Sequence, residues 1–250
     1  MVKKMVQTQG RLIDLPKSII PAADVDLGDL RILCAAVKGI AGIKAIKLGL
    51  DLGLTGLRQV VDVVKEANPD LIIIFDLQKA GNDIPPMGSK FAKRLKSSGV
   101  DSAILFPFAG PETQEAWTKA CMDEGLIVLT GGIMTHPKFL ASEGGYIPDY
   151  VPGRIYRLAI KLGVRSFVVP GNKLPWVEKL RALFDREIGT GKFDLYAPGF
   201  VTQGGDVSEC GQAAGPQFHA ICGSGIYGEP IRTEDEMREA ATKLVKAIAA

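Results

Sequence analysis

The 250-residue sequence has few cysteines and no long apolar run, and each absence excludes a class of protein. The four cysteines form neither a C-x-x-C metal pair nor a disulfide ladder, so we expect reduced core residues of a cytoplasmic protein. No apolar run approaches the roughly 18 residues of a membrane span. The opening residues MVKKMVQTQGRLIDL lack the apolar region and cleavage site of a signal peptide. The cysteines are Cys34, Cys121, Cys210 and Cys222.

The sequence also lacks an excess of charge of either sign. Its 30 lysines and arginines against 28 aspartates and glutamates give a formal net charge of +2, and the basic residues are scattered. Binding to nucleic acid by electrostatics requires a strongly basic face, which this distribution does not provide. We therefore expect a soluble globular protein that binds neither nucleic acid nor a membrane. Its 46% hydrophobic residues suffice for a large core.

The sequence does have a regular alternation of strand and helix patterns. Short apolar runs, typical of strands buried on both faces, alternate with segments whose apolar residues have helical spacing. The last helix, expected over 233–248, opens with Thr233 and Glu236 as a capping box. Strands are expected at 18–25, 43–48, from 71, and at 102–108, 126–133, 165–169, 193–198 and 218–222.

Eight strand–helix units in succession predict a (β/α)₈ TIM barrel, an α/β fold. We expect one domain over residues 1–250, with residues 1–16 as a short N-terminal extension. A doubly wound open sheet is the alternative, because periodicity does not distinguish an open sheet from a closed one. The absence of a long linker, a low-complexity stretch or a break in composition favours the single barrel.

Charged residues concentrate in LIIIFDLQKAGNDIPP, residues 71–86, at the end of the third expected strand. Asp76, Lys79 and Asp83 lie within eight positions of one another there. A solvated loop with charges paired at the surface is the simplest interpretation. The location favours a functional site instead, because active-site groups of barrels lie at the C-terminal ends of the strands. The ends of the first and second strands add Asp24 and Lys47.

The last units end in glycine-rich turns. In barrels, the turns after the seventh and eighth strands commonly bind phosphate through backbone N–H groups. The sequence therefore suggests a phosphorylated ligand whose reacting end lies at the Asp/Lys cluster. Gly223, Gly225 and Gly228 spell G-x-G-x-x-G, but Pro230 follows too soon and only one helix remains, so we reject a dinucleotide site.

In the order of the chain, these motifs resemble the orotidine 5′-phosphate decarboxylase family. The resemblance is carried by AADV, IKLG, FDLQKAGNDIP, MTHP, VVPGN, APGFVTQGG and GSGIY. Three departures are visible. The Asp-x-Lys-x-x-Asp-Ile-Pro signature of the family is two residues longer here, Ser224 replaces the phosphate-binding arginine, and Met87 replaces a hydroxyl residue.

The resemblance implies decarboxylation of orotidine 5′-phosphate to uridine 5′-phosphate without a metal or cofactor. Lys79 would be the proton donor, held protonated by Asp76 and Asp83, and Lys47 would balance Asp76. A homodimer follows from the family pattern, with Asp83 and Ile84 reaching the partner's site. The residues implied in substrate binding are Asp24, Ile84, Thr135, Pro198, Gln203, Gly204, Gly205, Gly223 and Ser224.

Two alternatives remain open. One is a magnesium-dependent lyase or aldolase similar to hexulose-phosphate synthases, which carry a glutamate at the end of strand two, where Lys47 stands. The other is a phosphometabolite-binding relative without catalysis, suggested by Ser224 and the longer signature. Release of CO₂ from orotidine 5′-phosphate, measured with and without a chelator, separates these possibilities.

Overall fold

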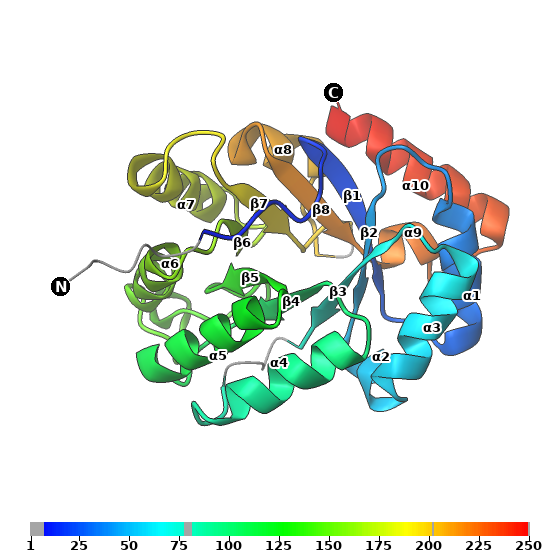
Figure 1. The fold of residues 1–250 in the computed structure, drawn as a ribbon. Helices are drawn as coiled ribbons and strands as arrows, with labels where there is room; N and C mark the ends of the chain where they lie inside the picture. Colours follow the sequence, from blue (N-terminus) through cyan, green and yellow to red (C-terminus); the bar gives the residue numbers. More distant parts are fainter. Residues whose placement is uncertain (1–7, 78–81, 202, 250) are drawn as a thin grey trace.

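The computed structural model describes residues 8–77, 82–201 and 203–249. Within these residues, eight parallel strands form a closed barrel in which each strand pairs with the next and the last pairs with the first. Figure 1 shows the helices arranged around the outside of the strands. The predicted (β/α)₈ barrel is therefore confirmed, and the open sheet is excluded.

The strands are β1 (Lys17–Ala23), β2 (Ala45–Leu48), β3 (Ile72–Asp76), β4 (Ser102–Leu105), β5 (Ile127–Gly131), β6 (Ser166–Val168), β7 (Asp194–Ala197) and β8 (Phe218–Cys222). The helices are α1 (Leu27–Val37), α2 (Leu50–Leu54), α3 (Leu57–Ala67), α4 (Met87–Ser97), α5 (Pro111–Asp123), the 3₁₀ helix η1 (Ala141–Glu143), α6 (Val151–Lys161), α7 (Leu174–Glu187), α8 (Val207–Ala214), α9 (Ser224–Tyr227) and α10 (Glu234–Ala249).

Local signals explain where the long helices begin and end. Helix α5 begins with Pro111 directly after Gly110, whose φ of 120° favours glycine. The expected capping box of α10 is confirmed, since Glu236 Oε2 accepts hydrogen bonds from Thr233 N at 2.8 Å and Thr233 Oγ1 at 2.9 Å. Helices α2 and α9 and the 3₁₀ helix η1 were not predicted. Each is too short for an apolar period to show.

The segment before β1 packs against the barrel. Ile13 is fully buried and belongs to the cluster of apolar side chains that fills the barrel interior. Arg11 Nε lies 3.0 Å from Asp194 Oδ1, and Gln9 Nε2 donates to Val128 O at 2.9 Å. These contacts fix residues 9–13 near the N-terminal ends of β5 and β7.

A buried polar pair lies near this end of the barrel. Ser18 on β1 is directly opposite His219 on β8, and Ser18 Oγ lies 2.8 Å from His219 Nδ1. Both residues are fully buried, and the Tyr196 ring lies 4.7 Å from the imidazole ring. Burial lowers the pKa of His219 to about 3, with a smaller contribution from the charge of Arg11. The imidazole is therefore neutral at ordinary pH and serves packing.

The cysteines agree with the sequence prediction. All four are free and buried, and burial raises the pKa of each thiol to about 12. In the described part of the chain, none of the helices combines the length and apolar character needed to cross a bilayer.

Candidate active site

The ends of the first three strands bring together three of the predicted charged residues. Asp24 directly follows β1, Lys47 lies in β2, and Asp76 is the last residue of β3. Lys47 Nζ lies 3.4 Å from Asp24 Oδ1 and 3.4 Å from Asp76 Oδ2. The sequence-based expectation that these side chains meet at one end of the sheet therefore agrees with the geometry.

The ammonium group of Lys47 is buried between carboxylates that differ in exposure. The Lys47 and Asp76 side chains are 11% and 7% exposed, whereas that of Asp24 is 54% exposed. Burial raises the pKa of Asp76, the charge and hydrogen bond of Lys47 oppose this rise, and the Asp24 carboxylate adds to it. Asp76 Oδ1 is buried without a hydrogen-bond partner among the described residues. That oxygen can accept a hydrogen bond from a ligand or from another donor.

Gly49 makes room for this cluster. A Cβ atom at this position would lie 2.6 Å from Asp24 Oδ1 and 3.7 Å from Lys47 Nζ. Any side chain would therefore displace the Asp24 carboxylate. The glycine in the IKLG motif is needed for close approach.

Lys79, the predicted proton donor, lies outside the described residues. Asp83 and Ile84, from the same signature, are described and exposed, and Ile84 is 61% exposed. Their backbone is fastened to α5, because Thr113 Oγ1 donates to Asp83 O at 3.0 Å and Trp117 Nε1 donates to Ile84 O at 3.2 Å. Trp117 is buried and also holds this loop.

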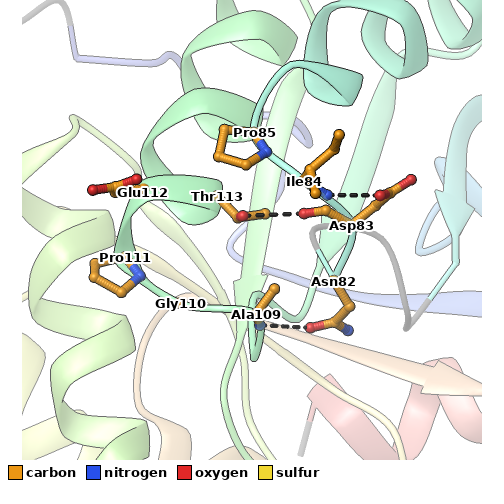
Figure 2. A pocket seen from close by; sticks show the side chains of 9 residues that line it. All are labelled: Asn82, Asp83, Ile84, Pro85, Ala109, Gly110, Pro111, Glu112 and Thr113. Carbon is orange, nitrogen blue, oxygen red and sulfur yellow. Dashed lines mark hydrogen bonds between the residues drawn. The ribbon is translucent and has the colours of Figure 1, made fainter.

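The loop lines a depression of about 520 Å³. Figure 2 shows the residues around it. Asn82 Oδ1 accepts a hydrogen bond of 3.0 Å from Ala109 N across this depression. The Asp83 carboxylate accepts one from Ile84 N at 2.7 Å, so one carboxylate oxygen supports the turn itself. The lining residues are Asn82, Asp83, Ile84, Pro85, Ala109, Gly110, Pro111, Glu112 and Thr113.

The turns after β5, β6 and β7 are joined by hydrogen bonds. Asn172 Nδ2 donates to Thr135 O at 3.2 Å and to Gln203 O at 3.4 Å. Gly171 N donates to Pro198 O at 2.9 Å. Three predicted ligand residues, Thr135, Pro198 and Gln203, are thus brought into one connected group. Asn172 itself was not predicted as a site residue.

Two predicted phosphate donors are engaged within their own turn. Gly204 N donates to Val201 O at 3.2 Å, and Gly205 N donates to Gly199 O at 3.1 Å. The sequence indicated the glycines but not these internal bonds. A phosphate bound here by these N–H groups would have to replace both carbonyl partners.

Gly223 and Ser224 lie where β8 passes into α9. Gly223 is the N-cap residue of α9, and Ser224 is its first residue. Arg232 Nη1 donates to Gly225 O at 2.7 Å and to Ile226 O at 2.9 Å, which stabilises this short helix from its other end. Sequence reasoning missed Arg232, although it is a basic residue shortly after the turn.

The connection from β5 to α6 is also tied to the site. Lys173 Nζ lies 2.7 Å from Glu143 Oε1 and donates to His136 O at 3.3 Å. The hydrogen bond from Lys173 is the main cause that lowers the pKa of Glu143. The Phe139 ring packs edge-on against both His136 and Phe108. The Lys173–Glu143 ion pair and the Phe139 ring contacts therefore order the turn that contains Thr135.

Among the residues that the structure describes, no three histidine, cysteine, aspartate or glutamate side chains gather in a way that could hold a metal ion. At the strand ends, the two neighbouring carboxylates are separated by Lys47 instead of facing a common point. The Lys47 ammonium therefore already provides the positive charge between these two carboxylates.

Comparisons with known proteins find relatives in sequence and in structure. No protein-family model matches the sequence. Curated orotidine 5′-phosphate decarboxylases from Methanosarcina barkeri and Methanosphaera stadtmanae are similar to it. The first is 29% identical over 209 residues, 83% of this chain and 84% of that protein. The second is 27% identical over 190 residues, 74% of this chain and 78% of that protein.

Solved structures show the same fold. The orotidine 5′-phosphate decarboxylase of Pyrococcus horikoshii OT3 superposes with a TM-score of 0.73 at 24% identity, covering 93% of this chain and 99% of that one. The orotidine 5′-monophosphate decarboxylase of Methanocaldococcus jannaschii, complexed with the inhibitor BMP, gives a TM-score of 0.74 at 20% identity. It covers 94% of this chain and 100% of the other.

Proposed function

We propose that this chain, a divergent member of the orotidine 5′-phosphate decarboxylase family, releases CO₂ from orotidine 5′-phosphate and forms uridine 5′-phosphate. The observation that carries the proposal is the Asp24–Lys47–Asp76 cluster at the strand ends, in which Lys47 and Asp76 are buried. It occurs in a chain that is similar over most of its length to curated decarboxylases.

The reaction requires a positive charge and a proton at one carbon. The bond between C6 of the pyrimidine and the carboxylate breaks, CO₂ leaves, and the electron pair stays on C6 in an orbital outside the ring π system. A fixed cation lowers the energy of this charge as it develops. Lys79, between Asp76 and Asp83 in the sequence, would supply the cation and transfer its proton to C6. The amine then takes a proton from water.

Asp76 and Lys47 would prepare the site for this step. The buried ammonium of Lys47 favours the charged form of Asp76 against the cost of burial. An ionised Asp76 would in turn hold Lys79 protonated. Asp76 Oδ1, which has no hydrogen-bond partner among the described residues, leaves a position for that contact.

The remaining predicted residues would bind the nucleotide. The half-exposed Asp24 carboxylate can accept hydrogen bonds from ribose hydroxyls. Thr135 would contact the base, and Pro198 would line the site beside it. Gln203, Gly204, Gly205, Gly223 and Ser224 would surround the phosphate, with the two glycine N–H groups after β7 exchanging their carbonyl partners for phosphate oxygens.

The Asp83–Ile84 loop supports the proposal of a homodimer. Both side chains are exposed, yet their backbone carbonyls are held by Thr113 and Trp117. A loop that is fixed at its base and exposed at its side chains can complete a site on a second copy. Asp83 would then reach the partner's Lys79.

The proposed reaction uses neither metal nor cofactor. The test is to measure CO₂ release and uridine 5′-phosphate formation from orotidine 5′-phosphate with purified protein, with and without a chelator. Equal turnover in both conditions supports the proposal. Turnover lost on chelation would favour a metal-dependent lyase, and binding of uridine 5′-phosphate without turnover would favour a non-catalytic relative.

A further inference from the structure

Asn172 connects two turns that are distant in the sequence. It follows β6, and its side-chain nitrogen donates one hydrogen bond to Thr135 O in the turn after β5. The same nitrogen donates a second hydrogen bond to Gln203 O in the turn after β7. Each bond uses a backbone carbonyl, so the link does not depend on the side chains of Thr135 or Gln203.

The chemistry of the partners fixes the orientation of the Asn172 amide. Both partners are carbonyl oxygens, which only accept hydrogen bonds, so the NH₂ group must face them. Asn172 Oδ1 is buried and has no partner among the described residues. Among the described residues, the polar interactions of this side chain are the two donated bonds.

The glycines of the turn after β7 allow that turn to lie close to Asn172. A Cβ atom on Gly199 would lie 3.2 Å from Asn172 Oδ1, and one on Gly205 would lie 3.3 Å from Asn172 Cα. The turn after β7 is thus packed directly against this residue. Asn172 can set the distance between the two turns because it is both hydrogen-bonded and closely packed.

We propose that Asn172 is a positioning residue that holds the Thr135 turn and the Gln203 turn at the spacing needed by one ligand that contacts both. The identity of that ligand, a nucleotide with its base at one turn and its phosphate at the other, rests on the proposed function. Asn172 acts through the two backbones and does not need to touch the ligand.

This role has a consequence for binding. When two recognition points are held at the right distance, the second contact of a linked ligand forms as an intramolecular event. Loosening the spacing therefore weakens a ligand that spans both turns more than one that fills a single turn. Uridine 5′-phosphate represents the first kind of ligand, and inorganic phosphate represents the second.

Asn172→Asp keeps the shape of the side chain, replaces the donor by an acceptor and adds a negative charge, whereas Asn172→Ala removes the two hydrogen bonds without adding charge. We expect uridine 5′-phosphate to bind about tenfold more weakly, corresponding to about 1.4 kcal/mol, and inorganic phosphate to be weakened less, since the added charge acts on both ligands but the spacing acts only on the nucleotide. Asn172→Ala should have a similar or smaller effect, since it removes the bonds without adding repulsion. It also serves as the test if the aspartate variant does not fold.

The matched control is Gln9→Glu, the same change of amide to acid at another side chain that donates to a backbone carbonyl. Gln9 donates to Val128 O at 2.9 Å, near the N-terminal end of β5. We expect this variant to leave both affinities unchanged. If the loss of any such hydrogen bond disturbed the whole barrel, ligand affinity would fall in both variants.

Hydrogen exchange of the ligand-free protein tests the link without a nucleotide. Asn172→Asp should accelerate amide exchange at Gly204 and Gly205 and in the turn around Thr135 together, whereas Gln9→Glu should not. Unchanged exchange in either turn, or an equal loss of affinity for uridine 5′-phosphate and phosphate, would overturn the proposal. If the wild-type protein binds no uridine 5′-phosphate, the proposed function fails, and exchange alone decides the role of Asn172.

Discussion

Lys47 Nζ lies 3.4 Å from Asp76 Oδ2, and both side chains are almost completely buried. Neither charge is well solvated at this depth, so each is stabilised mainly by its attraction to the other. The pair joins the ends of two neighbouring strands, β2 and β3. It therefore serves stability and the electrostatics of the candidate site at once.

Replacing Lys47 by methionine should leave the Asp76 carboxylate buried without its cation. We expect Lys47→Met to lower the free energy of unfolding at pH 8 by about 3 kcal/mol. The loss should shrink as the pH falls. Asp76 would have a further raised pKa in the folded variant, so the folded state binds the proton more readily than the unfolded state. Denaturant unfolding at pH 5 and pH 8 measures the difference.

Arg58→Met is the control, because it removes the cation of a pair that is exposed to solvent. Arg58 Nε lies 3.0 Å from Asp62 Oδ1, and both side chains are at least half exposed. We expect a loss of less than about 0.5 kcal/mol and little pH dependence. If both variants lose the same free energy of unfolding, the buried Lys47–Asp76 pair contributes no more to stability than an exposed pair, which contradicts the prediction.

Mixed dimers should reveal whether Asp83 acts in the partner's site. Lys79→Ala and Asp83→Ala subunits should each be inactive alone. After subunit exchange, one site of each mixed dimer contains both native residues, so activity should return to about a quarter of the wild-type value if subunits mix randomly and in equal amounts. Native mass spectrometry verifies the exchange. No recovery after verified exchange would show that each site is built from one chain.

Restoring an arginine at position 224 should strengthen phosphate binding. A charge-assisted hydrogen bond contributes on the order of 1.5–3 kcal/mol. We therefore expect Ser224→Arg to tighten binding of uridine 5′-phosphate and raise kcat/KM by about tenfold or more. Calorimetry and steady-state kinetics measure the two effects. Unchanged or weaker values would indicate that another cation already fills this position, or that the phosphate binds elsewhere.

His219 should remain neutral across the physiological range. Its folded pKa of about 3 lies below the ordinary value of 6.5, so the unfolded state takes up the proton first as the pH falls. Stability should therefore decrease from about pH 6.5 downward, by about 2 kcal/mol at pH 5, since one pH unit corresponds to about 1.4 kcal/mol.

The chain has two histidines, which makes the NMR test simple. The ring nitrogens of His219 should show no titration between pH 5 and 8. A His219→Gln variant should lose the corresponding pH dependence of unfolding between pH 5 and 6.5. A midpoint for His219 near 6.5 would contradict the neutral, buried state.

Regular patterns made most of the fold predictable. The apolar runs gave the observed bounds of β8, and the capping box placed the start of α10 to within one residue. Asp24, Lys47 and Asp76 could be placed together because each lies at the end of a strand. Closure of the sheet brings these ends together without any further signal in the sequence.

Features that depend on tertiary contacts could not be predicted. Asn172 looks like an ordinary turn residue after a Pro-Gly pair, and only the fold shows that it reaches carbonyls after β5 and β7. The glycine motif predicted free N–H donors, whereas Gly204 and Gly205 donate to carbonyls of their own turn. Helix α9 was missed because four residues carry no period.

The most direct test of the account is the turnover of a Lys79→Ala variant on orotidine 5′-phosphate, measured as CO₂ release in the presence of a chelator. The wild-type protein should turn over. The variant should lose at least about 100-fold in kcat, because it lacks the positioned acid. Its affinity for uridine 5′-phosphate should stay within about threefold of wild type. A variant that retains more than about a tenth of the wild-type rate would show that Lys79 is not the proton donor.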